Sequence, residues 1–231
     1  MSLQVYSSRS AQAEALGMLV ADQLHAAIEA QGHASLAVPG GTTPAPFMQA
    51  LARTRLDWLH VRITLTDERQ VAADHERSNA LLLRSHLLDA VPQAHFQPLF
   101  DAANPAGWLA AVEQQLQATL LPLDVCVLGM GADGHFASLF PAAEQLEAGL
   151  AVDNKAAVMA ITAANIPEPR ISLTLAALLT ARHIHLLISG EEKLQVLQQA
   201  QARLASGSER QLPIEALLQA AGERIKIHYA P

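Results

Sequence analysis

A chain of 231 residues with a net charge of −7 lacks the basic surface that a general nucleic-acid-binding protein needs to neutralise phosphates, so we expect no nucleic-acid partner. Hydrophobic residues make up 51% of the chain and charged residues 16%, which supplies a sizeable core and excludes wholesale disorder. Charged residues interrupt the richest apolar runs and the amino terminus is polar, so we expect no membrane partner, no export signal and a cytoplasmic location.

The first predicted elements are a helix, a strand and a second helix. Apolar residues recur with a 3.6-residue period over Arg9–Gln31, and Gly32 can end this helix in the left-handed conformation. A short apolar run over Ala34–Val38 predicts a strand. After a glycine turn, the pattern predicts a second helix over Pro44–Arg53, with Thr43 as its N-cap.

The order of strand, turn and helix then returns along the chain. The next strand is expected from His60 to Thr66, and a turn at Asp67–Arg69 separates it from a helix over Ser78–Leu88. A further strand over Leu123–Leu128 ends in a glycine-rich turn. A strand over Arg182–Ser189 precedes the last helix of this series.

Strands that alternate with helices predict an α/β fold, which we expect to be a single domain over residues 1–231 with a mostly parallel open sheet and helices on both faces. Parallel strands share one carboxyl edge, and ligands of open α/β sheets bind outside that edge. The four strand-to-helix junctions should therefore gather at one crevice, although they are far apart in the sequence.

The first junction carries Gly40, Gly41 and Thr42 between a strand and a helix start. Glycines there let backbone N–H groups approach an anion, and the helix dipole favours negative charge, so this turn suits a phosphate. The same residues also suit an ordinary turn with an N-cap. The turn lacks the Lys-Ser/Thr ending of a nucleotide-triphosphate loop, which disfavours kinase chemistry.

The third junction reads Gly-Met-Gly-Ala-Asp-Gly-His from Gly129 to His135, which matches the dinucleotide pattern G-x-G-x-x-G. We reject a dinucleotide site, because Asp133 would direct negative charge at a pyrophosphate and the motif comes late in the chain. His135, on a glycine-rich turn at the sheet edge, instead suits a general base that takes a proton from water.

Other reactive residues favour structural roles. Cys126 lies within a predicted buried strand. His183 and His185 share one face of a strand, but no third metal ligand with suitable spacing accompanies them, so we expect no metal site. No G-x-S-x-G nucleophile elbow occurs, and the remaining chemistry is general-base attack of water on an activated carbonyl.

Taken together, five blocks of the sequence resemble the 6-phosphogluconolactonase family. They are Gly-Gly-Thr-Thr-Pro from Gly40, Thr-Asp-Glu-Arg from Thr66 with Ser78-Asn79 downstream, Gly-Ala-Asp-Gly-His-Phe-Ala-Ser-Leu-Phe-Pro from Gly131, Arg-Ile-Ser-Leu-Thr from Arg170, and Gly-Glu-Glu-Lys from Gly190. The resemblance implies hydrolysis of 6-phospho-D-glucono-1,5-lactone, a small phosphorylated sugar lactone, in the oxidative pentose phosphate pathway. It implies no cofactor, and it leaves the oligomeric state open.

The resemblance also implies roles for individual residues. His135 is the general base, and Asp133 orients either His135 or a sugar hydroxyl. Arg69 either joins the phosphate site or stabilises the carbonyl oxygen. The remaining substrate-binding residues are Gly40, Gly41, Thr42, Arg170 and Lys193 around the phosphate, together with Asp67 and Asn79, which could equally brace the second junction.

Two alternatives belong to other functional classes. Glucosamine-6-phosphate deaminases have a similar fold and an Asp-Gly-His turn, but they carry a catalytic glutamate at the position that Phe140 holds here. A sugar-phosphate sensor that controls transcription would need a DNA-reading domain, and no basic helix-turn-helix segment precedes Leu36.

Overall fold

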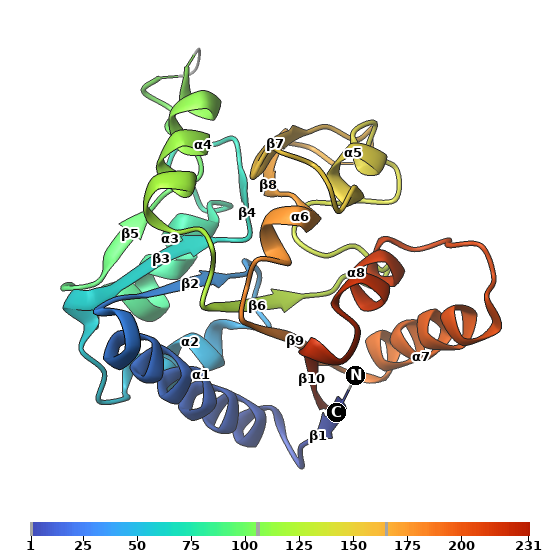
Figure 1. Cartoon of the computed structure of the whole chain (residues 1–231), viewed down its shortest axis with the longest axis horizontal. Coiled ribbons are helices and arrows are strands. Elements are labelled where there is room, and N and C mark those ends of the chain that lie inside the picture. The colour runs from blue at the N-terminus through green and yellow to red at the C-terminus, as the bar shows by residue number, and fades with distance from the viewer. Residues whose placement is uncertain (1, 105–106, 165) are drawn as a thin grey trace.

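The computed structural model, which describes residues 2–104, 107–164 and 166–231, contains a seven-stranded sheet in the order β1-β10-β9-β6-β2-β3-β5 (Figure 1). Every neighbouring pair in this sheet is parallel, which confirms the predicted parallel α/β fold. Its strands are β1 (Ser2–Val5), β2 (Ala34–Val38), β3 (Val61–Leu65), β5 (His95–Gln97), β6 (Val125–Gly129), β9 (His183–Ser189) and β10 (Ile225–Ala230).

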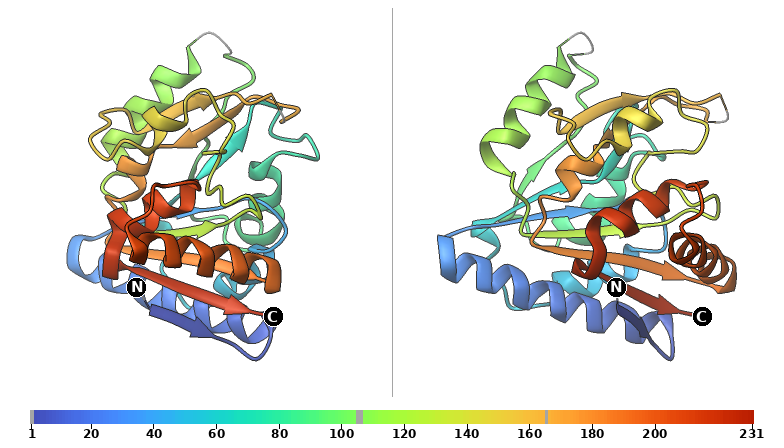
Figure 2. Two further views of the ribbon diagram at one scale, coloured as in Figure 1. Left: turned by 90° about the vertical axis from the view of Figure 1, so that its right-hand side faces the viewer. Right: turned by 45° about the vertical axis from the view of Figure 1, so that its right-hand side comes forward.

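Helices lie on both faces of this sheet, as predicted. Figures 1 and 2 show α1 and α2 on one face, and α6 and α8 on the other. The helices are α1 (Arg9–Gln31), α2 (Ala45–Ala52), α3 (Asn79–Leu83), α4 (Trp108–Thr119), α5 (Leu146–Leu150), α6 (Leu175–Leu178), α7 (Glu191–Ser206) and α8 (Pro213–Ala221), with two short 3-10 helices, η1 (Trp58–His60) and η3 (Gly222–Arg224), and a π-helix, η2 (Arg84–Leu88). Within the described residues, no helix is both long and apolar enough to cross a membrane.

The sequence did not predict a second, antiparallel sheet of three strands in the order β4-β8-β7. It consists of β4 (Asp67–Arg69), β7 (Val158–Ile161) and β8 (Arg170–Leu173), and it lies above the main sheet in Figure 1. The expected turn at Asp67–Arg69 is therefore wrong, because these residues form β4. A three-residue strand has too little periodicity to be recognised, and it is held by β8, which is distant in the sequence.

Several predicted boundaries agree with the structure. Helix α1 and strand β2 match the expected ranges, and Gly32 ends α1 with a φ of 80°. The expected N-cap of α2 is wrong, because Pro44 occupies that position and no side chain caps the helix. The helix expected over Ser78–Leu88 begins at Asn79, with Ser78 as its N-cap, and its second half, η2, is a π-helix.

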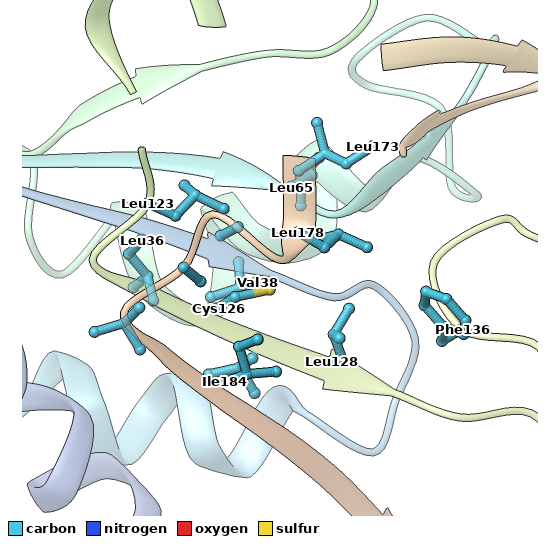
Figure 3. Packing of buried hydrophobic residues seen from close by; sticks show 14 of the residues in the cluster. Leu36, Val38, Leu65, Leu123, Cys126, Leu128, Phe136, Leu173, Leu178 and Ile184 are labelled. Carbon is cyan, nitrogen blue, oxygen red and sulfur yellow. The ribbon is translucent and has the colours of Figure 1, made fainter. Parts of the chain in front are cut away.

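The core lies between the main sheet and the layers that cover it. Cys126 of β6 packs among Leu36, Val38 and Ile184, as Figure 3 shows, and none of these side chains is exposed. Burial raises the pKa of the Cys126 thiol. This environment supports the structural role expected for the residue.

The order of the strands places a topological switch point beside β2. From β2 the chain continues outward to β3 and β5, and it then returns to the other side of β2 to form β6, β9 and β10. Loops that leave β2 and β6 in opposite directions open a crevice between them at the carboxyl edge. The glycine-rich turns at Gly40 and Gly131 follow these two strands.

Candidate active site

A cleft of about 370 Å³ opens at this switch point. It is lined by the loops that follow β2, β6 and β9, and by residues of β4 and β8 from the smaller sheet. Its lining residues are Pro39, Gly40, Gly41, Thr42, Thr43, Pro44, Asp67, Arg69, Asn79, Gly129, Met130, Gly131, His135, Ala137, Phe140, Arg170, Leu187 and Lys193. The four predicted junctions thus meet at one cavity, as the parallel sheet requires.

The loop after β2 turns sharply through two glycines. Gly41 has a φ of 88°, a conformation that favours glycine. A Cβ atom at Gly40 would lie 2.0 Å from Oδ1 of Asn79, so only a glycine allows the loop to pack on this amide. The loop can therefore present its backbone to an anion at the mouth of the cleft.

The pairing of β4 with β8 brings two arginines together. Arg69 and Arg170 lie directly opposite each other in the antiparallel register. Burial lowers the pKa of Arg170, and the positive charge of Arg69 lowers it further. The Nε atoms of both residues are buried without a hydrogen-bond partner. The charges of Asp67, Glu168 and Glu68 oppose this lowering of the pKa of Arg170, and Glu168 lies 3.8 Å from its guanidinium. The free Nε donors of the two adjacent cations still suit an anionic ligand.

A third cation, Lys193, reaches the cleft from the first turn of α7. Burial lowers the pKa of this amine, Glu192 opposes the shift, and the charge of Arg9 adds to it. Arg9 lines a small adjoining cavity of about 190 Å³, which shares Thr42 with the main cleft. Arg9 lies in the first turn of α1, outside every motif of the sequence, so no local signal pointed to it.

His135 is held by Asp133 in the glycine-rich turn. Nδ1 of His135 lies 2.5 Å from Oδ1 of Asp133, and this hydrogen bond lowers the pKa of the Asp133 carboxyl. Because an ionised carboxylate can only accept, the neutral form of this imidazole carries its proton on Nδ1 and its lone pair on Nε2. Gly131 is required beside them, since a Cβ there would lie 2.3 Å from Nδ1 of His135.

Asp67 and Asn79 both line the cleft, and both also brace it. Nδ2 of Asn79 donates to the Asp67 carbonyl at 2.8 Å. The Asp67 carboxylate accepts hydrogen bonds from Ser138 at 2.5 Å and from Thr66 at 3.3 Å. The structure thus supports the bracing interpretation without removing either residue from the cleft. Ser138 lies in the sequence block that contains His135, but its contact with Asp67 is not predictable from the sequence.

The predicted site residues lie in or beside the cleft, whereas His185 lies elsewhere in the structure. Asp133 is the only predicted site residue outside the cleft lining, and it touches His135 directly. His185 lies in the core, where it contacts His228 at 3.0 Å. In residues 2–104, 107–164 and 166–231, no group of three or more His, Cys, Asp or Glu side chains could hold a metal ion.

Comparison with known proteins gives one family and many full-length relatives. The family model described as glucosamine-6-phosphate isomerases/6-phosphogluconolactonase matches residues 7–226. A 6-phosphogluconolactonase of Rhizobium meliloti (strain 1021) is 43% identical over 100% of this chain and 99% of the relative. The 6-phosphogluconolactonase of Pseudomonas aeruginosa is 38% identical over 99% of this chain and 94% of the relative. A crystal structure of a 6-phosphogluconolactonase from Shewanella baltica OS155 has a TM-score of 0.88 and 35% identity, covering 100% of this chain and 97% of that one.

Proposed function

This chain belongs to the glucosamine-6-phosphate isomerase/6-phosphogluconolactonase family, and on that basis we infer that it hydrolyses 6-phospho-D-glucono-1,5-lactone to 6-phosphogluconate. The observation that carries this inference is that His135, which pairs with Asp133, lines a cleft that Arg69, Arg170 and Lys193 also line. A base beside a cluster of cations suits attack of water on the lactone ester of a phosphorylated sugar.

In the proposed reaction, the cleft supports direct attack of water on the lactone carbonyl. Nε2 of His135 takes a proton from the attacking water as the C–O bond forms, and Asp133 stabilises the resulting imidazolium. The ring C–O bond then breaks, and the imidazolium returns the proton to the leaving ring oxygen. One water is consumed, and the products are a carboxylic acid and the freed hydroxyl group.

The anion-binding groups divide between the two ends of the substrate. We assign Lys193, Arg170 and the loop from Gly40 to Thr42 to the phosphate, since charged side chains and backbone N–H groups bind phosphate strongly. Arg69 lies next to Arg170, and it either joins this site or stabilises the carbonyl oxygen as negative charge develops on it.

The alternative within the same family, an isomerising deaminase, is disfavoured by Phe140. The ring of Phe140 lies 4.5 Å from the imidazole of His135, between centroids, and places an apolar surface where the deaminases carry a carboxylate. The curated relatives described above are also named as lactonases.

The test measures two reactions with the same purified protein. We expect hydrolysis of freshly prepared 6-phosphogluconolactone above its spontaneous rate, and no release of ammonia from glucosamine 6-phosphate. Ammonia release without lactone hydrolysis would reverse the assignment. The cytoplasmic location, the single domain and the absence of a nucleic-acid partner stay predictions from the sequence.

A further inference from the structure

Glu68 is a buried carboxylate that the proposed reaction does not use. It lies on β4 between Asp67 and Arg69, and only 3% of its surface is exposed. Its two neighbours line the cleft, whereas Glu68 lines a separate cavity of about 440 Å³. This alternation follows from strand geometry, in which successive side chains point to opposite faces.

Each oxygen of this carboxylate accepts two hydrogen bonds. Oε1 accepts from the backbone N–H of Arg69 at 2.7 Å and of Asn79 at 2.8 Å. Oε2 accepts from the backbone N–H of Ala80 at 2.7 Å and from the hydroxyl of Ser78 at 3.1 Å. Burial raises the pKa of Glu68, and these four donors oppose that rise.

The donors to Glu68 come from two different elements that border the cleft. Arg69 belongs to β4, whereas Ser78 is the N-cap of α3, and Asn79 and Ala80 are its first two residues. Asn79 in turn supports Gly40 in the loop after β2, where its amide fills the space that a Cβ would occupy. Glu68 thus contacts the backbone of an arginine in the cleft and the backbone of the residue whose amide lies under the glycine loop, an amide that also donates to the Asp67 carbonyl.

We propose that Glu68 is a positioning residue for the lactonase reaction, which acts through Arg69 and Asn79 and touches no substrate itself. This proposal rests on the proposed function for its kinetic consequence. Its structural part, the attachment of α3 to β4, rests on the three hydrogen bonds that Ser78, Asn79 and Ala80 donate to Glu68.

The variant Glu68→Gln tests the proposal with almost no change in shape. The amide NH₂ must face two of the four donors whichever way it is turned, so at least two hydrogen bonds become repulsive contacts. We expect kcat/KM to fall at least about tenfold, because small displacements of positioned groups cost large factors in rate. Ser78→Ala removes one donor to Glu68, together with the side-chain N-cap of α3, and keeps the charge of Glu68. It should give a smaller loss, and it serves if the first variant does not fold.

The matched control is Asp124→Asn, which also replaces a buried carboxylate with an amide. Asp124 accepts the N–H of Ser35 at 2.8 Å and precedes β6 at the amino edge of the sheet, away from the cleft. We expect a lower Tm for this variant with kcat/KM within about twofold of the parent. Equal kcat/KM values for the two amide variants would overturn the proposal.

Two further measurements separate positioning from general destabilisation. In an Arg69→Ala background, Glu68→Gln should reduce kcat/KM by a smaller factor than in the parent, because part of its effect passes through Arg69. Hydrogen exchange should accelerate at the amides of Arg69, Asn79 and Ala80 and not at the core amide of Val127.

Fully additive kinetic effects, or uniform acceleration of exchange, would show a merely structural role. If the parent protein itself does not hydrolyse the lactone, the proposed function fails. The exchange pattern then still decides whether Glu68 holds β4 and α3 together.

Discussion

The contact between His135 and Asp133 determines which nitrogen of the imidazole can act as a base. The Asp133 carboxylate accepts a hydrogen bond from Nδ1–H, so the lone pair of the neutral imidazole is on Nε2. Gly131 makes the contact possible, because any larger residue would overlap the ring. The spacing of the Gly-x-Asp-Gly-His segment is therefore a requirement of geometry.

Replacing the proposed base should reduce turnover while leaving the protein folded. For His135→Asn we expect kcat, corrected for spontaneous hydrolysis, to fall at least about 100-fold with a smaller change in KM, since positioned base catalysis contributes about 10² to 10⁴. Steady-state kinetics and a melting curve measure this. Activity within about threefold of the parent would move the base elsewhere.

Removing a cation from the cleft should mainly weaken substrate binding. For Lys193→Ala or Arg170→Ala we expect KM to rise about 10- to 150-fold, because a charged hydrogen bond is worth about 1.5 to 3 kcal/mol. Inorganic phosphate should compete weakly with the substrate of the parent protein. Arg55→Ala, at an exposed position, is the control and should keep the parent KM. An unchanged KM in both cleft variants would contradict the assignment of the phosphate site.

At the scale of elements, a chain of hydrogen bonds ties β1, β9 and β10 to α1. Oε1 of Gln23 receives Nε2–H of His185 at 2.9 Å, and Nδ1 of His185 then accepts Nε2–H of His228 at 3.0 Å. Nδ1 of His228 accepts the hydroxyl of Tyr6, just beyond β1, at 2.8 Å. Every donor meets an acceptor only while both imidazoles are neutral.

These hydrogen bonds between neutral histidines predict that the protein loses stability in mild acid. Burial lowers the pKa of His185 to about 3 and that of His228 to about 4, and the charge of Lys226 contributes to both shifts. In the unfolded chain both histidines titrate near pH 6.5. As the pH falls below 6.5, the unfolded state therefore binds more protons than the folded state, and the free energy of unfolding decreases by about 2 kcal/mol per histidine at pH 5.

Melting temperatures at pH 7.5 and pH 5 measure this effect. The parent Tm should fall by several degrees between the two values. His228→Asn should have a lower Tm at pH 7.5 but a shallower dependence on pH. His25→Gln, at an exposed position on α1, should keep the parent slope. A parent Tm that is equal at both pH values would contradict the prediction.

At the scale of the whole molecule, an acidic protein concentrates cations at one edge of its sheet. The net charge is −7, yet the cleft holds Arg69, Arg170 and Lys193. The parallel order of β3, β2, β6 and β9 places their carboxyl ends side by side, and the smaller sheet adds the two arginines from above. The local charge of the cleft, and not the net charge, decides which ligand it binds.

We predict that the reaction needs no metal. The resemblance implies no cofactor, and the base that we propose is the His135–Asp133 pair, which needs none. Excess EDTA should leave the rate of lactone hydrolysis unchanged, after correction for the spontaneous rate at the same pH and ionic strength. Loss of activity that zinc restores would show that a metal takes part.

The sequence by itself determined the parallel α/β fold, the bounds of α1 and β2, and the candidate residues His135, Arg170 and Lys193. Apolar periodicity, glycine turns and short motifs are local signals, so they can be read along the chain. Taken together, these motifs also revealed the resemblance to a known family.

Only the tertiary structure decided how these residues meet. The strand at Asp67–Arg69, the opposition of Arg69 to Arg170, and the packing of Asn79 beneath Gly40 all join segments that are distant in the sequence. The same holds for Ser138 on Asp67 and for Glu68 at the start of α3. Hydrogen bonds and close contacts of this kind depend on distances in space, which no pattern of neighbouring residues encodes.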